Sequence, residues 1–283
     1  MPLGVHTSIA GHISYSIRRA LELGCETMQI FSHSPRGWKV RPFDTTEIDR
    51  FKAQLKAGTI NPLFVHISYL VNLASPEDNV YKRSIRLFIQ EIEMASSLGA
   101  NFVVTHLGST KGKGVEFGVE RVKDTLSYVL SCVPRGRVGI LLENTAGSGW
   151  SFGHRFEDIG RVIKAFGRDA SIGFCFDTCH GVAAGYPMRD ARDVDRLVDT
   201  IDRDIGLESL RLIHLNDSNG GLGSRLDRHQ HIGKGSIGLA GFRAIVNHPR
   251  LRHLPMIMET PKRSNRDDVR NLRVVRGLIK SRQ

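Results

Sequence analysis

Short apolar runs alternate with longer helical segments along the whole chain, and this alternation restricts the possible folds more than any other feature. The apolar runs are typical of buried β-strands because they are short and rich in β-branched and aromatic residues. Strands are predicted at 3–7, 27–31, 63–67, 102–106, 138–143, 172–177, 210–214 and 255–259. Helices are predicted at 11–23, 45–58, 76–98, 115–132, 156–167, 191–206, 239–247 and 265–281. Eight strand–helix units favour a closed α/β barrel of the TIM (β/α)8 type.

The continuous apolar character of the strands fits such a barrel. Helices cover its outer face and packed side chains fill its interior, so both faces of each strand are buried. A doubly wound open sheet would also explain the alternation, but eight repeats with polar strand ends along the whole chain favour closure. The sequence has no linker, no low-complexity segment and no break in composition. We therefore expect a single domain over residues 1–283.

Six of the eight predicted strands end on a side chain that can bind a metal ion. These residues are His66, His106, Glu143, Asp177, His214 and Glu259. The chain has 12 His and 29 Asp or Glu, so roughly one end in eight would carry such a residue by chance. One polar strand end is usually a hydrogen-bonding group, but six at equivalent positions predict a shared metal site. The absence of thiolates among them favours a catalytic over a structural site.

Two further segments extend the predicted ligand set. His180 follows Asp177 by three residues, in what we expect to be one loop, and Asp227 and His229 lie two residues apart. Zinc takes about four ligands, so nine candidates imply two or three ions. Clustered divalent ions suit phosphodiester cleavage, because one can activate water while the others hold the phosphate oxygens. Only a carboxylate can bridge two ions, and Glu143 is the predicted bridge because ligand-bearing strands lie on both sides of it.

The charge of the chain favours a polyanionic partner. The 40 Lys and Arg residues exceed the 29 Asp and Glu and give a formal charge of +11, which makes nucleic acid the leading candidate. Solubility alone is the other interpretation. The four cysteines form no C-x-x-C pair, which fits a reducing, cytoplasmic location. The N-terminus lacks the features of a signal peptide, no apolar run is long enough to span a bilayer, and no membrane partner is expected.

Six motifs, in order along most of the chain, resemble those of the endonuclease IV family. They are His66-Ile67-Ser68-Tyr69-Leu70, Glu143-Asn144-Thr145-Ala146-Gly147, Asp177-Thr178-Cys179-His180 with Ala184-Gly185-Tyr186, His214-Leu215-Asn216-Asp217-Ser218, Gly223-Ser224-Arg225-Leu226-Asp227-Arg228-His229 and Glu259-Thr260-Pro261. Members of this family are abasic-site DNA repair endonucleases built on a TIM barrel. The resemblance implies hydrolysis of the phosphodiester 5′ to an abasic site in duplex DNA, leaving a 3′-hydroxyl. It also implies the removal of blocking groups from 3′ ends.

The resemblance further implies three zinc ions, with Mn²⁺ able to replace part of the zinc. By this resemblance, His66, His106 and Glu143 would hold the first ion, Glu143, Asp177, His214 and Glu259 the second, and His180, Asp227 and His229 the third. A hydroxide that bridges zinc ions would be the nucleophile. Glu143, Glu259 and His106 are the residues that we expect to act in catalysis.

Loops on the same face would contact the DNA. The segment 31–38 resembles the family's loop that enters the minor groove, with Arg36 inserted and Trp38 next to it. Tyr69 and Leu70 would fill space near the flipped-out sugar. Ser34 and Gly37 stand where the family commonly has amides, and residues 107–110 replace its usual Pro-Gly-Ser-His. Lys111 is a candidate phosphate contact, and a mobile, solvated loop is the alternative.

Two other functions are left open by the residues. A metal-dependent sugar isomerase or epimerase also places His, Asp and Glu at the strand ends of a barrel, but it normally needs only one or two ions. The additional Asp227 and His229 and the basic charge therefore disfavour it. A barrel that only binds damaged DNA predicts a broken ligand set, and none of the nine ligands is missing. We expect a monomer, and we expect His6 and His231 to form ordinary hydrogen bonds rather than to bind metal.

Overall fold

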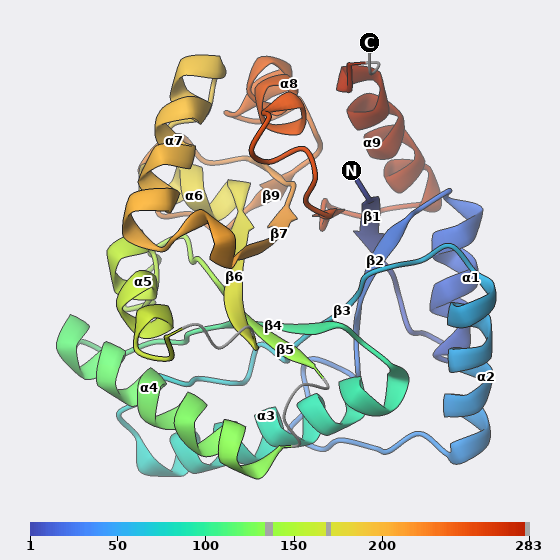
Figure 1. The fold of residues 1–283 in the computed structure, drawn as a ribbon, viewed down its shortest axis with the longest axis vertical. Helices are drawn as coiled ribbons and strands as arrows, with labels where there is room; N and C mark the ends of the chain where they lie inside the picture. The colour runs from blue at the N-terminus through green and yellow to red at the C-terminus, as the bar shows by residue number, and fades with distance from the viewer. Residues whose placement is uncertain (134–137, 168–170, 281–283) are drawn as a thin grey trace.

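The computed structural model describes residues 1–133, 138–167 and 171–280, and these form a closed barrel of eight parallel strands (Figure 1). The barrel strands are β1 (Leu3–His6), β2 (Thr27–Phe31), β3 (Leu63–His66), β4 (Phe102–His106), β5 (Gly139–Glu143), β6 (Ile172–Asp177), β7 (Leu210–His214) and β10 (Met256–Met258). Strands that follow one another along the chain are neighbours in the ring, and β10 pairs with β1 to close it. The predicted α/β barrel is confirmed.

Helices surround this ring, as Figure 1 shows. They are α1 (Ser14–Glu22), α2 (Thr45–Ala57), α3 (Asp78–Leu98), α4 (Val115–Cys132), α5 (Phe156–Lys164), α7 (Ala191–Asp204), α8 (Gly238–Asn247) and α9 (Asn265–Leu278). Each lies within a few residues of its predicted range, although residue 281, the predicted end of the last helix, is outside the described residues. Helix α3 ends at Leu98, as predicted, and is followed by Gly99, whose φ of 79° is the left-handed conformation that glycine adopts without strain.

Four short elements were not predicted from the sequence. They are the helix α6 (Thr178–Ala184), the 3-10 helix η1 (Leu207–Ser209) and the two strands of a small antiparallel hairpin, β8 (Asp217–Ser218) and β9 (His229–Gln230). Helix α6 begins directly after β6, because the Asp177 carboxylate accepts a hydrogen bond from the backbone N–H of His180 and caps the first turn. The expected loop from 177 to 180 is therefore a helix, and this prediction was wrong.

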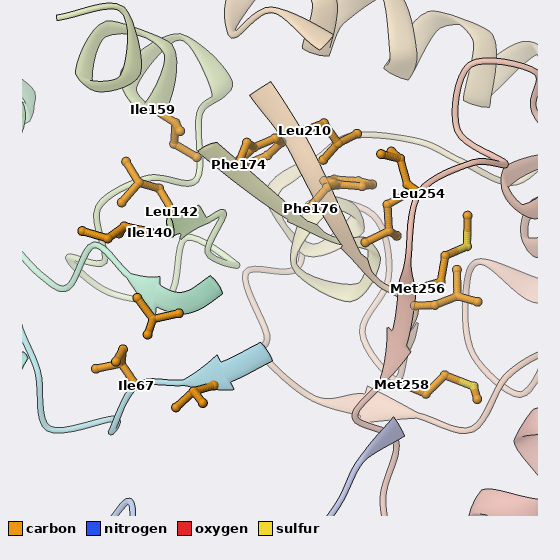
Figure 2. Packing of buried hydrophobic residues seen from close by; sticks show 14 of the residues in the cluster. Ile67, Ile140, Leu142, Ile159, Phe174, Phe176, Leu210, Leu254, Met256 and Met258 are labelled. Atoms are coloured by element: carbon orange, nitrogen blue, oxygen red, sulfur yellow. The ribbon is translucent and has the colours of Figure 1, made fainter. Parts of the chain in front are cut away.

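Two apolar clusters hold the barrel together. The larger one lies between the strands and the surrounding helices; Figure 2 shows part of it, including Ile140 of β5, Phe174 and Phe176 of β6 and Ile159 of α5. The smaller cluster fills the barrel interior and consists of Phe64, Val104, Leu141, Cys175, Leu212 and Ile257, all fully buried. The interior is thus a packed core, as expected for eight strands. Among the described residues, no helix is both long enough and apolar enough to cross a membrane.

Candidate metal centre

The six predicted strand-end ligands lie one layer above the interior cluster, toward the C-terminal ends of the strands. Side chains alternate between the two faces of a strand, so a residue two positions after an inward-facing one also faces inward. Each interior residue is followed two positions later by a ligand: Phe64 by His66, Val104 by His106, Leu141 by Glu143, Cys175 by Asp177, Leu212 by His214 and Ile257 by Glu259. Parallel pairing of the strands then brings the six together at one end of the barrel.

All nine predicted ligands occur in compact groups whose ligand atoms lie within 4.8 Å of one another. Three of these groups are His66, His106 and Glu143; Glu143, Asp177, His214 and Glu259; and His180, Asp227 and His229. Glu143 belongs to two of them, which is the position that a bridging carboxylate requires. Cys175 and Cys179 join two further groups, although burial raises the pKa of each thiol to about 12. Neither cysteine was among the predicted ligands.

In three of the histidines, one ring N–H donates a hydrogen bond to a backbone carbonyl. His66 Nδ1 lies 2.7 Å from the oxygen of the next residue, His180 Nδ1 lies 3.0 Å from the carbonyl of Asn144, and His229 Nδ1 lies 3.2 Å from that of Glu259. A carbonyl only accepts, so each Nδ1 carries the proton, and in the neutral ring Nε2 keeps its lone pair. Metal-binding histidines in proteins show this arrangement because the second hydrogen bond fixes the ring.

The other ring nitrogens face carboxylates. His66 Nε2 lies 3.1 Å from Glu143 Oε2, and His180 Nε2 lies 3.2 Å from Asp227 Oδ1. His229 Nε2 and His106 Nδ1 are buried and have no hydrogen-bond partner among the described residues. Buried polar atoms without partners are rare in proteins. In their neutral form these imidazoles would direct lone pairs into the same space as the carboxylate oxygens, and this combination fits the needs of divalent cations.

Two of these carboxylates, Glu143 and Asp227, are held in their charged form. Burial raises the pKa of a carboxyl group, but the imidazoles of His106 and His214 outweigh it and hold the pKa of Glu143 well below its ordinary value. Burial acts in the same direction on Asp227, and the hydrogen bond and charge of His180 outweigh it, so the pKa of Asp227 falls to about 2. Charged carboxylates are the form that binds a cation.

Gln29 and His6 complete the ring of inward-facing residues. Gln29 is fully buried; its Nε2 donates to Glu259 Oε1 at 2.6 Å, and its Oε1 lies 2.8 Å from His214 Nε2. His6 Nδ1 lies 3.3 Å from the same oxygen of Glu259. Because the amide oxygen accepts the Nε2 proton of His214, Nδ1 of that ring is directed toward Glu143 Oε1 and Glu259 Oε2, at 3.1 and 3.2 Å.

Gln29 was not predicted from the sequence, although the sequence contains a signal for it. Gln29 stands two residues after Thr27, and His6 two residues after Gly4, in the two barrel strands that carry no predicted ligand. The register that relates the interior cluster to the six ligands therefore selects both residues as well. An amide is a poor metal ligand compared with imidazole and carboxylate. The residue type of Gln29 therefore does not indicate a metal site.

Comparison with known proteins agrees with this geometry. Residues 17–278 match the family model described as a xylose isomerase-like TIM barrel. A probable endonuclease 4 from Methanoculleus marisnigri is 45% identical over 276 residues, which cover 98% of each chain. The chain belongs to the endonuclease IV family. The crystal structure of endonuclease IV from Thermus thermophilus superimposes with a TM-score of 0.88 at 38% identity, covering 98% of both chains. A D-tagatose 3-epimerase-like protein, with 20% identity and a TM-score of 0.74 over 98% of this chain and 97% of its own, shares the fold alone.

The five residues expected to contact DNA in a member of the endonuclease IV family differ in how free they are. Arg36 is exposed, and Tyr69 is 63% exposed. Trp38 is half-buried, with the guanidinium of Arg83 4.3 Å from its ring centre, and Leu70 packs against the outer core. Lys111 is exposed but forms an ion pair with Glu77. Arg36 and Tyr69 are therefore the side chains most available to a partner.

A buried carboxylate ties the two loops that carry these residues to the outer helix α3. Glu91 accepts hydrogen bonds from Ser68 N at 3.1 Å and from Ser32 Oγ at 3.2 Å. Ser68 Oγ donates to the carbonyl of Pro35 at 2.7 Å, which joins the loops directly. His33 Nδ1 lies 3.6 Å from Glu91, too far for a hydrogen bond. The loops after β2 and β3 thus form one connected unit.

Proposed function

We propose that this protein is a metal-dependent DNA repair endonuclease that hydrolyses the phosphodiester 5′ to abasic sites in duplex DNA. The convergence of nine His, Asp and Glu side chains in three groups, two of which share Glu143, carries this proposal. Membership of the endonuclease IV family supports the same reaction. The formal charge of +11 supports a polyanionic substrate. We further propose that 3′ blocking groups are removed at the same centre.

We propose zinc as the resident metal, because imidazoles combined with carboxylates suit it. The three groups His66, His106 and Glu143; Glu143, Asp177, His214 and Glu259; and His180, Asp227 and His229 would hold one ion each. When bound, the cations would lower the pKa of water and neutralise charge that develops on the phosphate oxygens. Three further predictions remain: that the chain is a single domain, that it is a monomer, and that it is cytoplasmic.

The protein's own groups then have separate roles. Backbone carbonyls orient the rings of His66, His180 and His229 by accepting their Nδ1 protons. Glu143 supplies a charged carboxylate at the centre of the cluster, since its pKa is held low. The interior cluster below the ligands excludes water from the barrel and gives these charges a low-dielectric base.

A cavity of about 530 Å³ opens beside Glu259 and is our proposed place for the substrate nucleotide. Its lining includes the apolar groups of Phe31, Pro35 and Tyr69 and also Lys262. An abasic nucleotide has lost the pairing and stacking of its base, so less free energy is needed to move it out of the helix. We propose that Tyr69 and Arg36 occupy the space that it leaves.

Cleavage of a duplex with one abasic analogue tests this function. Purified protein is incubated with zinc and that duplex, with an intact duplex, and separately with aldoses and ketoses. We expect a single cut on the 5′ side of the lesion, an end that a polymerase extends, no cut in the intact duplex, and loss of activity with a chelator. Turnover of sugars without any cleavage of DNA would instead support the isomerase or epimerase alternative.

Substitution of Arg36 tests whether the loop after β2 inserts this side chain into the DNA. Arg36 forms no ion pair within the described part of the chain, so Arg36→Ala removes a cation without leaving a buried charge unpaired. We expect the preference for abasic over intact duplex to fall about fivefold, roughly the effect of one phosphate or groove contact. Arg192→Ala, at an exposed position of α7, is the matched control. Equal preference in Arg36→Ala and Arg192→Ala would contradict insertion by this side chain.

A further inference from the structure

A second cavity, of about 260 Å³, lies on the face that carries the metal ligands. We call it the Trp150 pocket; its lining includes Gly112, Trp150, His154, Asp158 and Arg225. It is lined by the loops that follow β4 and β5, by the first turns of α4 and α5, and by the loop that leads to β9. The strands β4 and β5 end on metal ligands, and Arg225 lies two residues before another. None of the nine ligands lines this pocket, so it is separate from the cluster although it shares its loops.

Trp150 offers an aromatic surface at the rim of the pocket. Its side chain is 67% exposed. A Cβ placed on Gly112 would lie between 3.7 and 3.8 Å from three indole atoms, so the loop backbone supports one face of the ring. Two backbone hydrogen bonds, Thr110 N to Trp150 O at 3.2 Å and Phe152 N to Gly108 O at 2.8 Å, fix the loop that carries it. A rigid, exposed indole is a typical platform for stacking of a nucleobase.

The pocket also contains buried polar atoms that lack partners. Asp158 is only 4% exposed, and its Oδ2 has no hydrogen-bond partner among the described residues. The same holds for His154 Nδ1. A buried acceptor without a donor costs free energy, so a ligand with an N–H donor would be stabilised here. The amino groups of adenine, guanine and cytosine are donors of this kind.

Two cations near the pocket are free to bind phosphate. Arg225 and Lys113 are exposed, and neither forms an ion pair in the part of the chain that the structure describes. The backbone of Arg225 is held by a hydrogen bond from Ser148 Oγ and by its own N–H, which donates to Ala183 O at 2.9 Å. A cation beside an aromatic platform is the combination that binds a single nucleotide of a strand.

We propose that the Trp150 pocket binds an unstacked nucleobase of the DNA substrate, which packs against the indole and donates its amino group to Asp158. This inference rests on the proposed function, because it assumes that DNA lies across the face with the metal ligands. It makes Trp150 and Asp158 residues that determine how DNA is held and which base is preferred near the cut. Arg225 binds the phosphate next to that base.

The affinity for DNA tests the stacking contact. Binding of the holoenzyme to the pre-nicked product duplex, which is not cleaved again, is measured by fluorescence anisotropy. Trp150→Ala should weaken binding about fivefold or more, the usual contribution of one stacked base, and Trp150→Phe should restore most of it. Tyr128→Ala is the control, since Tyr128 is 55% exposed on the outer helix α4. Equal affinity of Trp150→Ala, Trp150→Phe and wild type would overturn the proposal.

A fluorescent base identifies which nucleotide of the duplex the Trp150 pocket binds. 2-Aminopurine is placed in turn opposite the abasic analogue and at each neighbouring position. At one position we expect a fluorescence change on binding that disappears in Trp150→Ala; a change at no position that depends on Trp150 rejects the pocket as a base site. Wild-type cleavage is measured on the same duplexes. Normal cleavage with no effect of Trp150 refutes the pocket alone, whereas absence of cleavage refutes the proposed function.

The proposed hydrogen bond from the base amino group to Asp158 is tested independently. At the position that 2-aminopurine identifies, adenine is compared with purine, which lacks the amino group. Wild type should bind the purine duplex about fivefold more weakly, as expected for the loss of one hydrogen bond. Asp158→Ala should bind the two duplexes equally, and Asp158→Asn, which keeps an acceptor oxygen, should retain part of the difference. An equal ratio in all three proteins would exclude Asp158 as the acceptor.

Discussion

Two layers inside the barrel come from the same six strands and have opposite chemistry. The lower layer is apolar and consists of the six residues from Phe64 to Ile257. The upper layer, two residues further along the chain from each of them, consists of imidazoles and carboxylates. In β5 both layers are free of solvent, because Leu141 and Glu143 are each 0% exposed. The side chains of His106 and Glu259, in contrast, are 29% and 17% exposed. In β5, a step of two residues therefore changes the function of a position without changing its burial.

The difference shows how each layer is stabilised. Lower-layer side chains are stabilised by removal of apolar surface from water and by close packing. Upper-layer groups lose hydration when they are buried, and this cost is offset by hydrogen bonds and opposite charges. Glu143, for example, lies within 3.3 Å of nitrogens of His66, His180 and His214. Substitutions in the lower layer should thus change stability, and those in the upper layer should change chemistry.

Glu143→Gln should have the largest effect. The change keeps the size of the side chain but removes the charge shared by two of the ligand groups. We expect cleavage of the abasic duplex to fall by about three orders of magnitude or more, while DNA binding is largely kept. Single-turnover kinetics and binding to the product duplex measure the two effects. Near-normal turnover would contradict a central role for Glu143, and an anomalous-scattering map with no metal near this carboxylate would exclude bridging.

Leu141→Ala tests the lower layer, two residues earlier in the same strand. The substitution leaves a cavity in the packed interior, and we expect the free energy of unfolding to fall by about 3 kcal/mol. Urea denaturation measures it, and the folded fraction should still cleave DNA. The control is Leu239→Ala, at a position 46% exposed on α8, where the loss should stay below about 1 kcal/mol. Loss of activity in fully folded Leu141→Ala would show that the two layers are not independent.

Gln29→Leu tests the border between the layers, because Gln29 is buried in the upper ring without being a ligand type. The leucine cannot donate to Glu259 or accept from His214, so both ligands lose a fixed orientation. Groups that orient ligands typically contribute about 10- to 100-fold to metal affinity. Chelator competition followed by metal counting measures this loss in the absence of substrate.

The exposed Gln54, on α2, provides the matched control for the Gln29 experiment. Gln54→Leu should keep the metal content and affinity of wild type. If Gln29→Leu also kept both, Gln29 would be a space-filling residue in the barrel and not one that positions ligands.

The barrel and the predicted ligands were accessible from sequence because both follow from repeated local patterns. The apolar runs mark strands that are buried on both faces, and the residue type at each strand end is visible directly. Gln29 was not predicted, because an amide is not a metal-ligand type and only its position in the register of β2 marks it. Its contacts with His214 and Glu259 depend on closure of the barrel, which brings together residues 185 and 230 positions apart.

Helix α6 shows a second limit of the sequence. Only Thr178–Ala184, seven residues, form it, and a helix of this length has little intrinsic stability. Its formation depends on tertiary contacts, including Asn216 Nδ2, which donates to Asp177 Oδ2 at 2.6 Å and holds the capping carboxylate. The Trp150 pocket likewise depends on loops from three parts of the chain. Contacts that form only after folding are the part that periodicity and spacing do not reveal.

Two buried glutamates extend the comparison beyond the barrel interior. Histidines around Glu143 hold its pKa well below the ordinary value, whereas burial raises the pKa of Glu91 to about 7, despite hydrogen bonds from Ser68 and Ser32 that lower it. The difference lies in the neighbours: several imidazoles surround Glu143, and mostly uncharged donors surround Glu91. Glu91 should therefore be partly protonated near neutral pH.

Glu91→Gln tests this contrast and should have the smallest effect. A carboxyl whose folded-state pKa is raised stabilises the fold fully below its unfolded value of 4.5, and this contribution is lost as pH rises through about 7. The free energy of unfolding of wild type relative to Glu91→Gln should thus decrease from pH 5 to pH 8, by on the order of 2 kcal/mol. Glu93→Gln, exposed on the same helix, should show no such slope. A difference that stays constant over this range, or that grows with pH, would mean that Glu91 is charged in the folded protein and that its neighbours stabilise the charge as the imidazoles do around Glu143.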